Sequence, residues 1–153
     1  MRFLGCGKTT SYIKLKDKID ILDSDSSTFD KKDFPNNYIK HIKENIGKVD
    51  VIFVSSHQIV RNAMKENSII YSMYYPAKRR KKEMLELYKM RGNNEDFIWF
   101  LENNFEFFID NIEKENIEGA KIRLENEGDF ILNDQLFDNL IKQIIKNNEE
   151  NNK

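Results

Sequence analysis

The stretch VDVIFV, residues 49–54, decides the fold class of this 153-residue chain. It is short, rich in β-branched residues and ended by Ser55, Ser56 and His57, as is typical of a buried strand. Two similar apolar runs, IDILDSD at residues 19–25 and SIIYSMYY at residues 68–75, predict further strands. Helical patterns at about residues 5–18, 38–45 and 58–66 alternate with these runs. This alternation predicts an α/β fold, with a mostly parallel sheet and helices on both faces.

The region after residue 76 changes in character, because residues 77–117 contain many helix formers and no strand pattern. Its apolar residues are spaced three and four apart, which predicts a long helix that packs on the sheet rather than a cofactor pocket. These residues are Phe97, Phe100, Leu101, Phe105, Phe108, Ile109 and Ile112. Short strands at residues 121–125 and 130–132 and a last helix at residues 134–145 complete a single predicted domain, residues 1–146. Residues 147–153 form a polar tail.

The composition excludes several classes of protein. The 25 Lys and Arg residues balance 26 Asp and Glu residues, so the chain lacks the overall positive charge of a protein that coats DNA. The single cysteine, Cys6, excludes an internal disulfide, and no cluster of Cys and His has zinc-ligand spacing. No apolar run reaches the roughly 18 residues of a membrane span, and no leader pattern opens the chain. We therefore expect a cytoplasmic protein that makes no contact with membranes.

The sequence GCGKTT, residues 5–10, carries the clearest chemical signal. Glycines let backbone N–H groups surround phosphate oxygens, a Lys reaches the terminal phosphates, and a hydroxyl group holds Mg²⁺. The pattern Gly, four residues, Gly-Lys-Ser/Thr is incomplete here, because its first position is Arg2. The strand that should precede the loop would also need residues before Met1. We therefore expect either a site completed by an upstream sequence or an impaired nucleotide site.

Several segments together resemble a family of small phage and prophage P-loop proteins related to nucleoside and polynucleotide kinases. The resemblance covers roughly residues 5–135. Its segments are GCGKTT, ILDSDSSTF, DFPNNYIKHIKENIGKVDVIFVSSHQIVRNAM, YYP, RGNNEDF and NNFEFFI. It implies a three-layer P-loop kinase-like sandwich whose first strand is shortened or missing, in the cytoplasm of a bacterial host.

The resemblance also implies roles for the residues of the loop. Gly5, Gly7, Lys8 and Thr9 would bind phosphate, and Thr9 would also bind the metal ion. The cofactors would be ATP and Mg²⁺ if the phosphate loop is functional, and otherwise there would be none. A helical lid would occupy about residues 77–117.

Asp23 and Asp25 follow the strand predicted at residues 19–25. Ligands bind at the carboxyl edge of a parallel sheet, so two carboxylates there could accept a proton from a substrate hydroxyl or help to hold Mg²⁺. Related kinases place an acidic residue at this point. The alternative is that DSDSS only ends the strand and caps the following turn.

A second polar group, formed by Ser55, Ser56 and His57, follows the next strand and lies on the same predicted edge. Histidine carries protons near neutral pH. One His beside two Ser residues does not make a hydrolase triad, because no acid is positioned to orient the His. A phosphate-facing or structural polar cluster and a catalytic group are both consistent with this pattern.

The basic run at residues 78–82 is the one strongly positive patch of the sequence. It comprises Lys78, Arg79, Arg80, Lys81 and Lys82. With Arg91, Arg79 and Arg80 occupy the region where the resemblance implies a lid, whose arginines would stabilise charge on a transferring phosphoryl group. The run could instead contact nucleic-acid phosphate or an acidic protein surface, or be a solvated helix face.

Two functions remain open at this stage. The first is a non-catalytic phage protein that binds and inhibits a host enzyme, for example an anti-CRISPR protein that blocks a nuclease effector through a basic and aromatic surface. The second is an Mg²⁺-dependent phosphotransferase that moves phosphate from ATP to a nucleotide or polynucleotide hydroxyl. The incomplete loop slightly favours the inhibitor as the present activity, whereas the motifs favour the kinase fold as its origin.

Overall fold

The computed structural model of the chain describes residues 6–151. Gly5 and the shortened strand expected at residues 1–4 lie outside this range. The described residues form a mixed α/β fold with four short strands and six α-helices. In chain order these are α1 (Lys8–Leu15), β1 (Ile21–Asp23), α2 (Asn36–Asn45), β2 (Val51–Phe53), α3 (Gln58–Glu66), β3 (Met73–Pro76), α4 (Lys81–Met90), α5 (Glu95–Lys114), β4 (Lys121–Leu124) and α6 (Gln135–Asn151). Short 3₁₀ helices η1 (Ser26–Thr28), η2 (Lys78–Arg80) and η3 (Ile131–Asn133) lie in the connections.

The strands are parallel, as expected, but they form two sheets of two strands each within the described residues. β1 pairs with β2, and β3 pairs with β4. Aromatic side chains lie between the two pairs of strands: the Phe137 ring of α6 lies 6.2 Å from that of Phe53 on β2 and 6.4 Å from that of Tyr74 on β3. A cavity of about 690 Å³ also lies between residues of β2 and β3. Residues 6–151 thus bear out a mixed α/β fold with parallel strands, which are described as two pairs.

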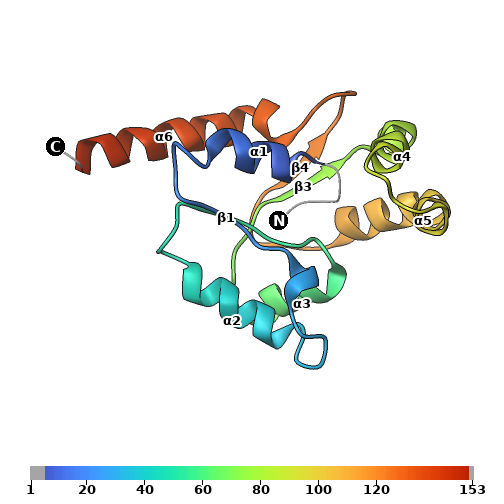
Figure 1. Cartoon of the computed structure of the whole chain (residues 1–153), viewed down its shortest axis with the longest axis horizontal. Coiled ribbons are helices and arrows are strands. Elements are labelled where there is room, and N and C mark those ends of the chain that lie inside the picture. The colour runs from blue at the N-terminus through green and yellow to red at the C-terminus, as the bar shows by residue number, and fades with distance from the viewer. Residues whose placement is uncertain (1–5, 152–153) are drawn as a thin grey trace.

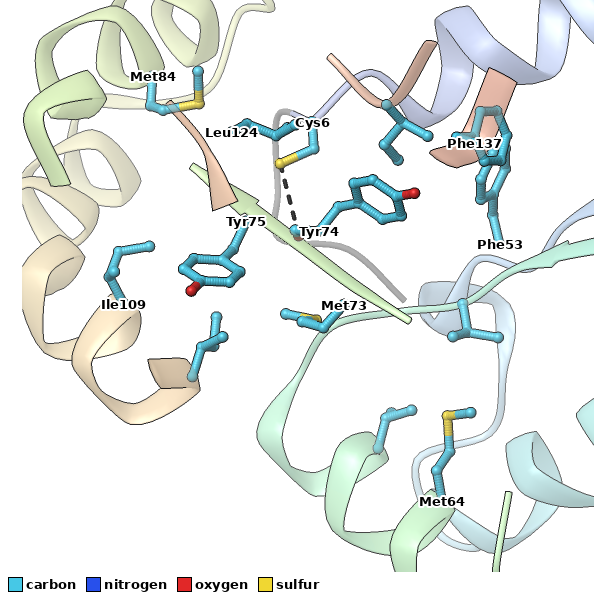
Figure 2. Packing of buried hydrophobic residues seen from close by; sticks show 14 of the residues in the cluster. Cys6, Phe53, Met64, Met73, Tyr74, Tyr75, Met84, Ile109, Leu124 and Phe137 are labelled. Carbon is cyan, nitrogen blue, oxygen red and sulfur yellow. Dashed lines mark hydrogen bonds between the residues drawn. The ribbon is translucent and has the colours of Figure 1, made fainter. Parts of the chain in front are cut away.

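Helices lie on both sides of the strands, which agrees with the sequence pattern (Figure 1). α1 and α6 lie on one side, α2 and α3 lie on the other, and α4 and α5 pack together at one end of the molecule. The buried side chains of these layers form one cluster (Figure 2). In it, Tyr75 of β3 faces Ile109 of α5, and Phe53 faces Phe137. Among residues 6–151, no helix is long and apolar enough to cross a bilayer.

Three local predictions need correction. The strand predicted at residues 130–132 is η3 instead, because Asn133 N–H donates to the Phe130 carbonyl in a helical turn. The last helix does not end at Ile145 but continues to Asn151, where the pair Lys146–Glu150 supports its exposed face. Phe100, expected in the core, is 48% exposed. The helix predicted at residues 58–66 is confirmed with the same bounds.

Candidate functional site

An ion pair between Lys8 and Asp23 lies where α1 begins and β1 ends. The Lys8 ammonium lies 2.5 Å from Asp23 Oδ1, and the two side chains are only 13% and 22% exposed. Oδ1 makes no hydrogen bond to any other described residue. The backbone N–H groups of the first helical turn have no partners within the helix, and together they favour an anion. The pair therefore sets a cation and a carboxylate at a helix end suited to bind phosphate.

Gly7 allows α1 to begin at this place. Its φ of 88° lies in the left-handed region, which residues with a Cβ rarely adopt. A Cβ at Gly7 would also lie 3.0 Å from Phe130 Cβ. No side-chain hydrogen bond caps the helix at Gly7. Thr9 lies exposed on the first turn.

Asp25 caps a turn, which is one of the two roles that the sequence left open for DSDSS. It precedes η1, and its Oδ1 accepts a hydrogen bond of 2.9 Å from Ser27 N–H. This bond, supported by the Lys8 and Lys31 charges, holds the pKa of Asp25 below its ordinary value. Asp25 is thus an ionised capping carboxylate within electrostatic reach of Lys8. Asp23 is the carboxylate that contacts Lys8 directly.

The buried Tyr38 holds the ends of β1 and β2 together. Its hydroxyl donates to the Ser24 carbonyl and accepts from Ser55 N–H, each at 2.9 Å. The Ser24 hydroxyl beside it is buried and has no hydrogen-bond partner among the described residues. Burial is the main cause that raises the pKa of Tyr38, so this hydroxyl stays protonated. Tyr38 therefore joins the polar segment that follows β1 to the polar segment that follows β2.

His57 stands at the start of α3, on the same edge. Desolvation and the positive charges of Lys31 and Arg61 lower its pKa, against the opposing effect of Asp25. His57 is therefore neutral at pH 7 and able to accept a proton. Lys8 and Asp23 are thus in direct contact, Asp25 lies within electrostatic reach of Lys8, and His57 lies within electrostatic reach of Asp25.

Arg61 is a further buried residue of this neighbourhood, and its place in the sequence predicts no role for it. Its Nε donates to Glu115 Oε2 at 2.6 Å, and Nη1 donates to the Ser56 carbonyl at 2.6 Å. Arg61 is only 5% exposed. Arg61 ends the segment VSSHQIVR, but its partner Glu115 lies 54 residues further along the chain. Residue spacing in the sequence therefore could not predict this pair. Arg61 therefore ties the turn before α3 to the end of α5.

The basic run at residues 78–82 is largely neutralised by neighbouring carboxylates. Its ion pairs are Lys78–Asp110, Arg79–Glu125, Arg80–Glu83 and Lys81–Glu106. Arg80 is 1% exposed, so it is a buried structural residue and cannot reach a partner. Lys82 is exposed and makes no ion pair with a described residue. Little of the expected positive field is left for nucleic-acid phosphate.

The arginines of the expected lid do not join the Lys8 group in this structure. Arg79 reaches Glu125, Arg80 reaches Glu83, and the Arg91 guanidinium lies 5.9 Å from the centre of the Tyr88 ring. These contacts hold η2, α4 and the loop after β4 together. The described contacts therefore support a packing role for the buried Arg80, whereas Arg79 and Arg91 make their contacts at the surface.

The side chains near Lys8 are compatible with a magnesium nucleotide. Mg²⁺ usually keeps several waters and takes one or two carboxylates along with substrate phosphates. Asp23, Asp25 and the exposed Thr9 hydroxyl offer ligands of this kind, and Lys8 offers the cation for phosphate. Residues 6–151 contain no group of three or more His, Cys, Asp or Glu side chains placed to hold a metal ion. The donor set thus fits an ion that arrives with its nucleotide.

Comparisons of the chain with protein-family models, with curated proteins and with solved structures gave no match. The resemblance to P-loop kinases therefore rests on the sequence segments quoted above.

Proposed function

We propose that the chain has a P-loop kinase-like fold and uses the Lys8–Asp23 site to bind the phosphates of ATP with Mg²⁺, for phosphoryl transfer to a hydroxyl group. The observation that carries this proposal is the 2.5 Å pair between Lys8 and Asp23, which joins the first residue of α1 to the last residue of β1. Lys8 of the glycine-rich segment and Asp23 of DSDSS thus lie in contact. Bound nucleotide would supply the transferable phosphoryl group, and Mg²⁺ would neutralise its charge.

In the reaction, the acceptor hydroxyl oxygen bonds to the γ-phosphorus, and the bond from that phosphorus to the β–γ bridging oxygen breaks. ADP leaves, and the proton of the hydroxyl passes to a carboxylate. Asp23 suits this task better than Asp25, because Asp25 is engaged by Ser27 N–H and has a lowered pKa. When Lys8 turns to phosphate, its ion pair with Asp23 Oδ1 breaks, and Asp23 becomes free to accept the proton. The ion pair thus keeps both groups in place before substrate arrives.

Isothermal titration of the full chain with ATP and Mg²⁺ tests the proposal. Charge-assisted contacts contribute about 1.5–3 kcal/mol, so we expect Lys8→Ala to weaken binding by about 10- to 150-fold. Lys14→Ala is the matched control, because Lys14 is an exposed lysine of the same helix. The proposal should be dropped if the wild type binds no ATP, or if Lys8→Ala binds as well as Lys14→Ala.

A second candidate is a protein that inhibits a host nuclease effector by binding it, as an anti-CRISPR protein does. The observation in its favour is the exposure of large aromatic side chains on α5, where Trp99 is 66% and Phe107 is 61% exposed. Aromatic residues are enriched at the centres of protein interfaces. Since the basic run is mostly paired, this face would rely on its aromatic side chains rather than on positive charge.

A cleavage assay with an RNA-guided nuclease tests the second candidate. Wild type should slow cleavage, and the double variant Trp99→Ala/Phe107→Ala should not. Met90→Ala is the control, because Met90 is 84% exposed outside α5. Equal inhibition by all three proteins would remove the aromatic face of α5 from the account.

A further inference from the structure

The cavity between β2 and β3 is large enough to hold a small molecule. Its volume of about 690 Å³ lies within the roughly 300–1,000 Å³ typical of ligand pockets. Neither Lys8 nor Asp23 is among the described residues that line this β2–β3 cavity. The cavity is therefore separate from the candidate phosphate site, and the two can be tested independently.

The deep part of the β2–β3 cavity is apolar. Two tyrosines contribute to the lining, but their hydroxyls are engaged elsewhere: Tyr71 donates to Glu115 Oε1 and Tyr74 to Asp134 Oδ1. The deep part therefore suits a hydrocarbon chain. Its buried lining residues include four that Figure 2 labels, and among them are Ile42, Phe53, Met64, Tyr74, Ile131 and Phe137.

The rim of the cavity is exposed but still apolar. Ile46 at the end of α2 is 54% exposed, Ile70 before β3 is 67% exposed, and Leu140 of α6 is 48% exposed. All three side chains line the cavity. Exposed apolar side chains that gather around a hollow are typical of a ligand-binding groove. The cavity is thus open to a ligand that enters from solvent.

Lys43 is the one charged side chain among the described residues that line the cavity. It is exposed at the end of α2, and its ammonium donates to Asn67 Oδ1, a neutral partner, at 2.7 Å. It makes no ion pair with a described residue, so its positive charge is not neutralised. Because no Asp or Glu is among the described lining residues, the mouth of the cavity favours an anion.

We infer that the β2–β3 cavity binds a free fatty acid, with the hydrocarbon chain among the buried side chains and the carboxylate at Lys43. Each buried CH₂ group contributes about 4-fold in affinity, so the chain supplies most of the binding. An exposed ion pair contributes at most about 5-fold, so Lys43 selects the headgroup. The inference goes beyond the proposed phosphoryl transfer and does not depend on it.

Isothermal titration of the full chain with octanoate, decanoate and laurate tests the inference. Each lengthening by two CH₂ groups should tighten binding by about 15-fold as long as the added carbons are buried. Dodecanol and dodecylammonium, which have the chain length of laurate, should bind more weakly than laurate. Lys43→Ala should weaken laurate binding by up to about 5-fold and leave dodecanol binding unchanged.

Matched variants control for changes outside the cavity. Lys40→Ala should leave laurate binding unchanged, because Lys40 is an exposed lysine of the same helix that does not line the cavity. Ile46→Glu brings a carboxylate to the rim and should weaken laurate binding. Ile13→Glu should not weaken it, because Ile13 is a 59% exposed residue of α1 outside the cavity lining. Circular dichroism checks that each variant is folded.

Three results would overturn the inference: no binding of laurate, equal affinities for laurate and dodecylammonium, or equal effects of Lys43→Ala and Lys40→Ala. Tighter binding of a blocked peptide of alternating valine and threonine would also overturn it, because the cavity would then accept an extended polypeptide strand. Lys8→Ala should not change laurate binding. Loss of ATP binding therefore leaves this inference standing, and failure to bind laurate leaves the phosphate site standing.

Discussion

Tyr38→Phe isolates the hydroxyl that links the two strand ends of the candidate site. Phe keeps the aromatic ring, which lies 5.0 Å from Phe29 and 5.9 Å from Phe34, so apolar packing is preserved. The substitution removes the donor to the Ser24 carbonyl and the acceptor for Ser55 N–H. Tyr38 is 0% exposed, so water does not readily replace the lost hydroxyl.

A buried polar group left without a partner costs about 1–3 kcal/mol, so we expect Tyr38→Phe to lower the free energy of unfolding by that amount. Urea unfolding followed by circular dichroism measures the change. Tyr12→Phe is the control, because the Tyr12 hydroxyl has no hydrogen bond to a described residue, and such a change usually stays within about 0.5 kcal/mol. If Tyr38→Phe also stays within about 0.5 kcal/mol of wild type, the bridge between β1 and β2 does not hold the site together.

The remaining predictions concern the lid-like region and the second sheet. Arg80→Ala leaves Glu83 without its buried partner, so it should lower the free energy of unfolding by about 3–5 kcal/mol in a urea titration. Arg79→Ala is the control, because Arg79 belongs to an exposed ion pair, and it should change the free energy of unfolding by less than about 1 kcal/mol. Hydrogen bonds from Arg80 are the main cause that lowers the pKa of Glu83. The pair therefore stabilises the fold at pH values above the ordinary pKa of Glu, and this stabilisation is lost as the pH falls through the lowered pKa. Acid unfolding of Glu83→Gln should lack this step, and an unchanged acid profile would contradict the assignment. Gly119→Ala would place a Cβ 1.9 Å from the Tyr71 carbonyl oxygen, so the melting temperature of this variant should lie clearly below that of wild type in a thermal scan. An unchanged melting temperature would show that the backbone around Gly119 is not closely packed.

Local patterns in the sequence predicted the elements of the fold better than their pairing. VDVIFV forms a strand because its β-branched residues suit a buried sheet, and residues 58–66 form a helix with the predicted bounds. The pairing of the described strands, β1 with β2 and β3 with β4, could not be predicted in this way, because strand pairing depends on contacts between residues far apart in the chain. The same holds for η3, where Ile131 N–H donates to the carbonyl of Cys6, a residue far away in the sequence.

In the candidate site, too, local patterns could be predicted from the sequence but most side-chain pairs could not. Lys8 and Asp23 could be brought together from sequence, because one opens a helix and the other ends a parallel strand. The pairs Arg61–Glu115 and Arg80–Glu83 could not be foreseen as buried, since a run of charges looks the same in sequence whether it is solvated or packed. Arg80, which was expected to act in catalysis or partner binding, is buried and packs inside the fold.

A titration of the ¹⁵N-labelled chain with ATP and Mg²⁺, followed by amide NMR spectra, tests most directly whether the Lys8–Asp23 pair binds phosphate. We expect the largest shift changes at Lys8, Thr9, Asp23 and Asp25, with a smaller change at His57, and their loss in Lys8→Ala. Changes confined to α5, or the same changes in wild type and Lys8→Ala, would show that the Lys8–Asp23 pair is not the phosphate site.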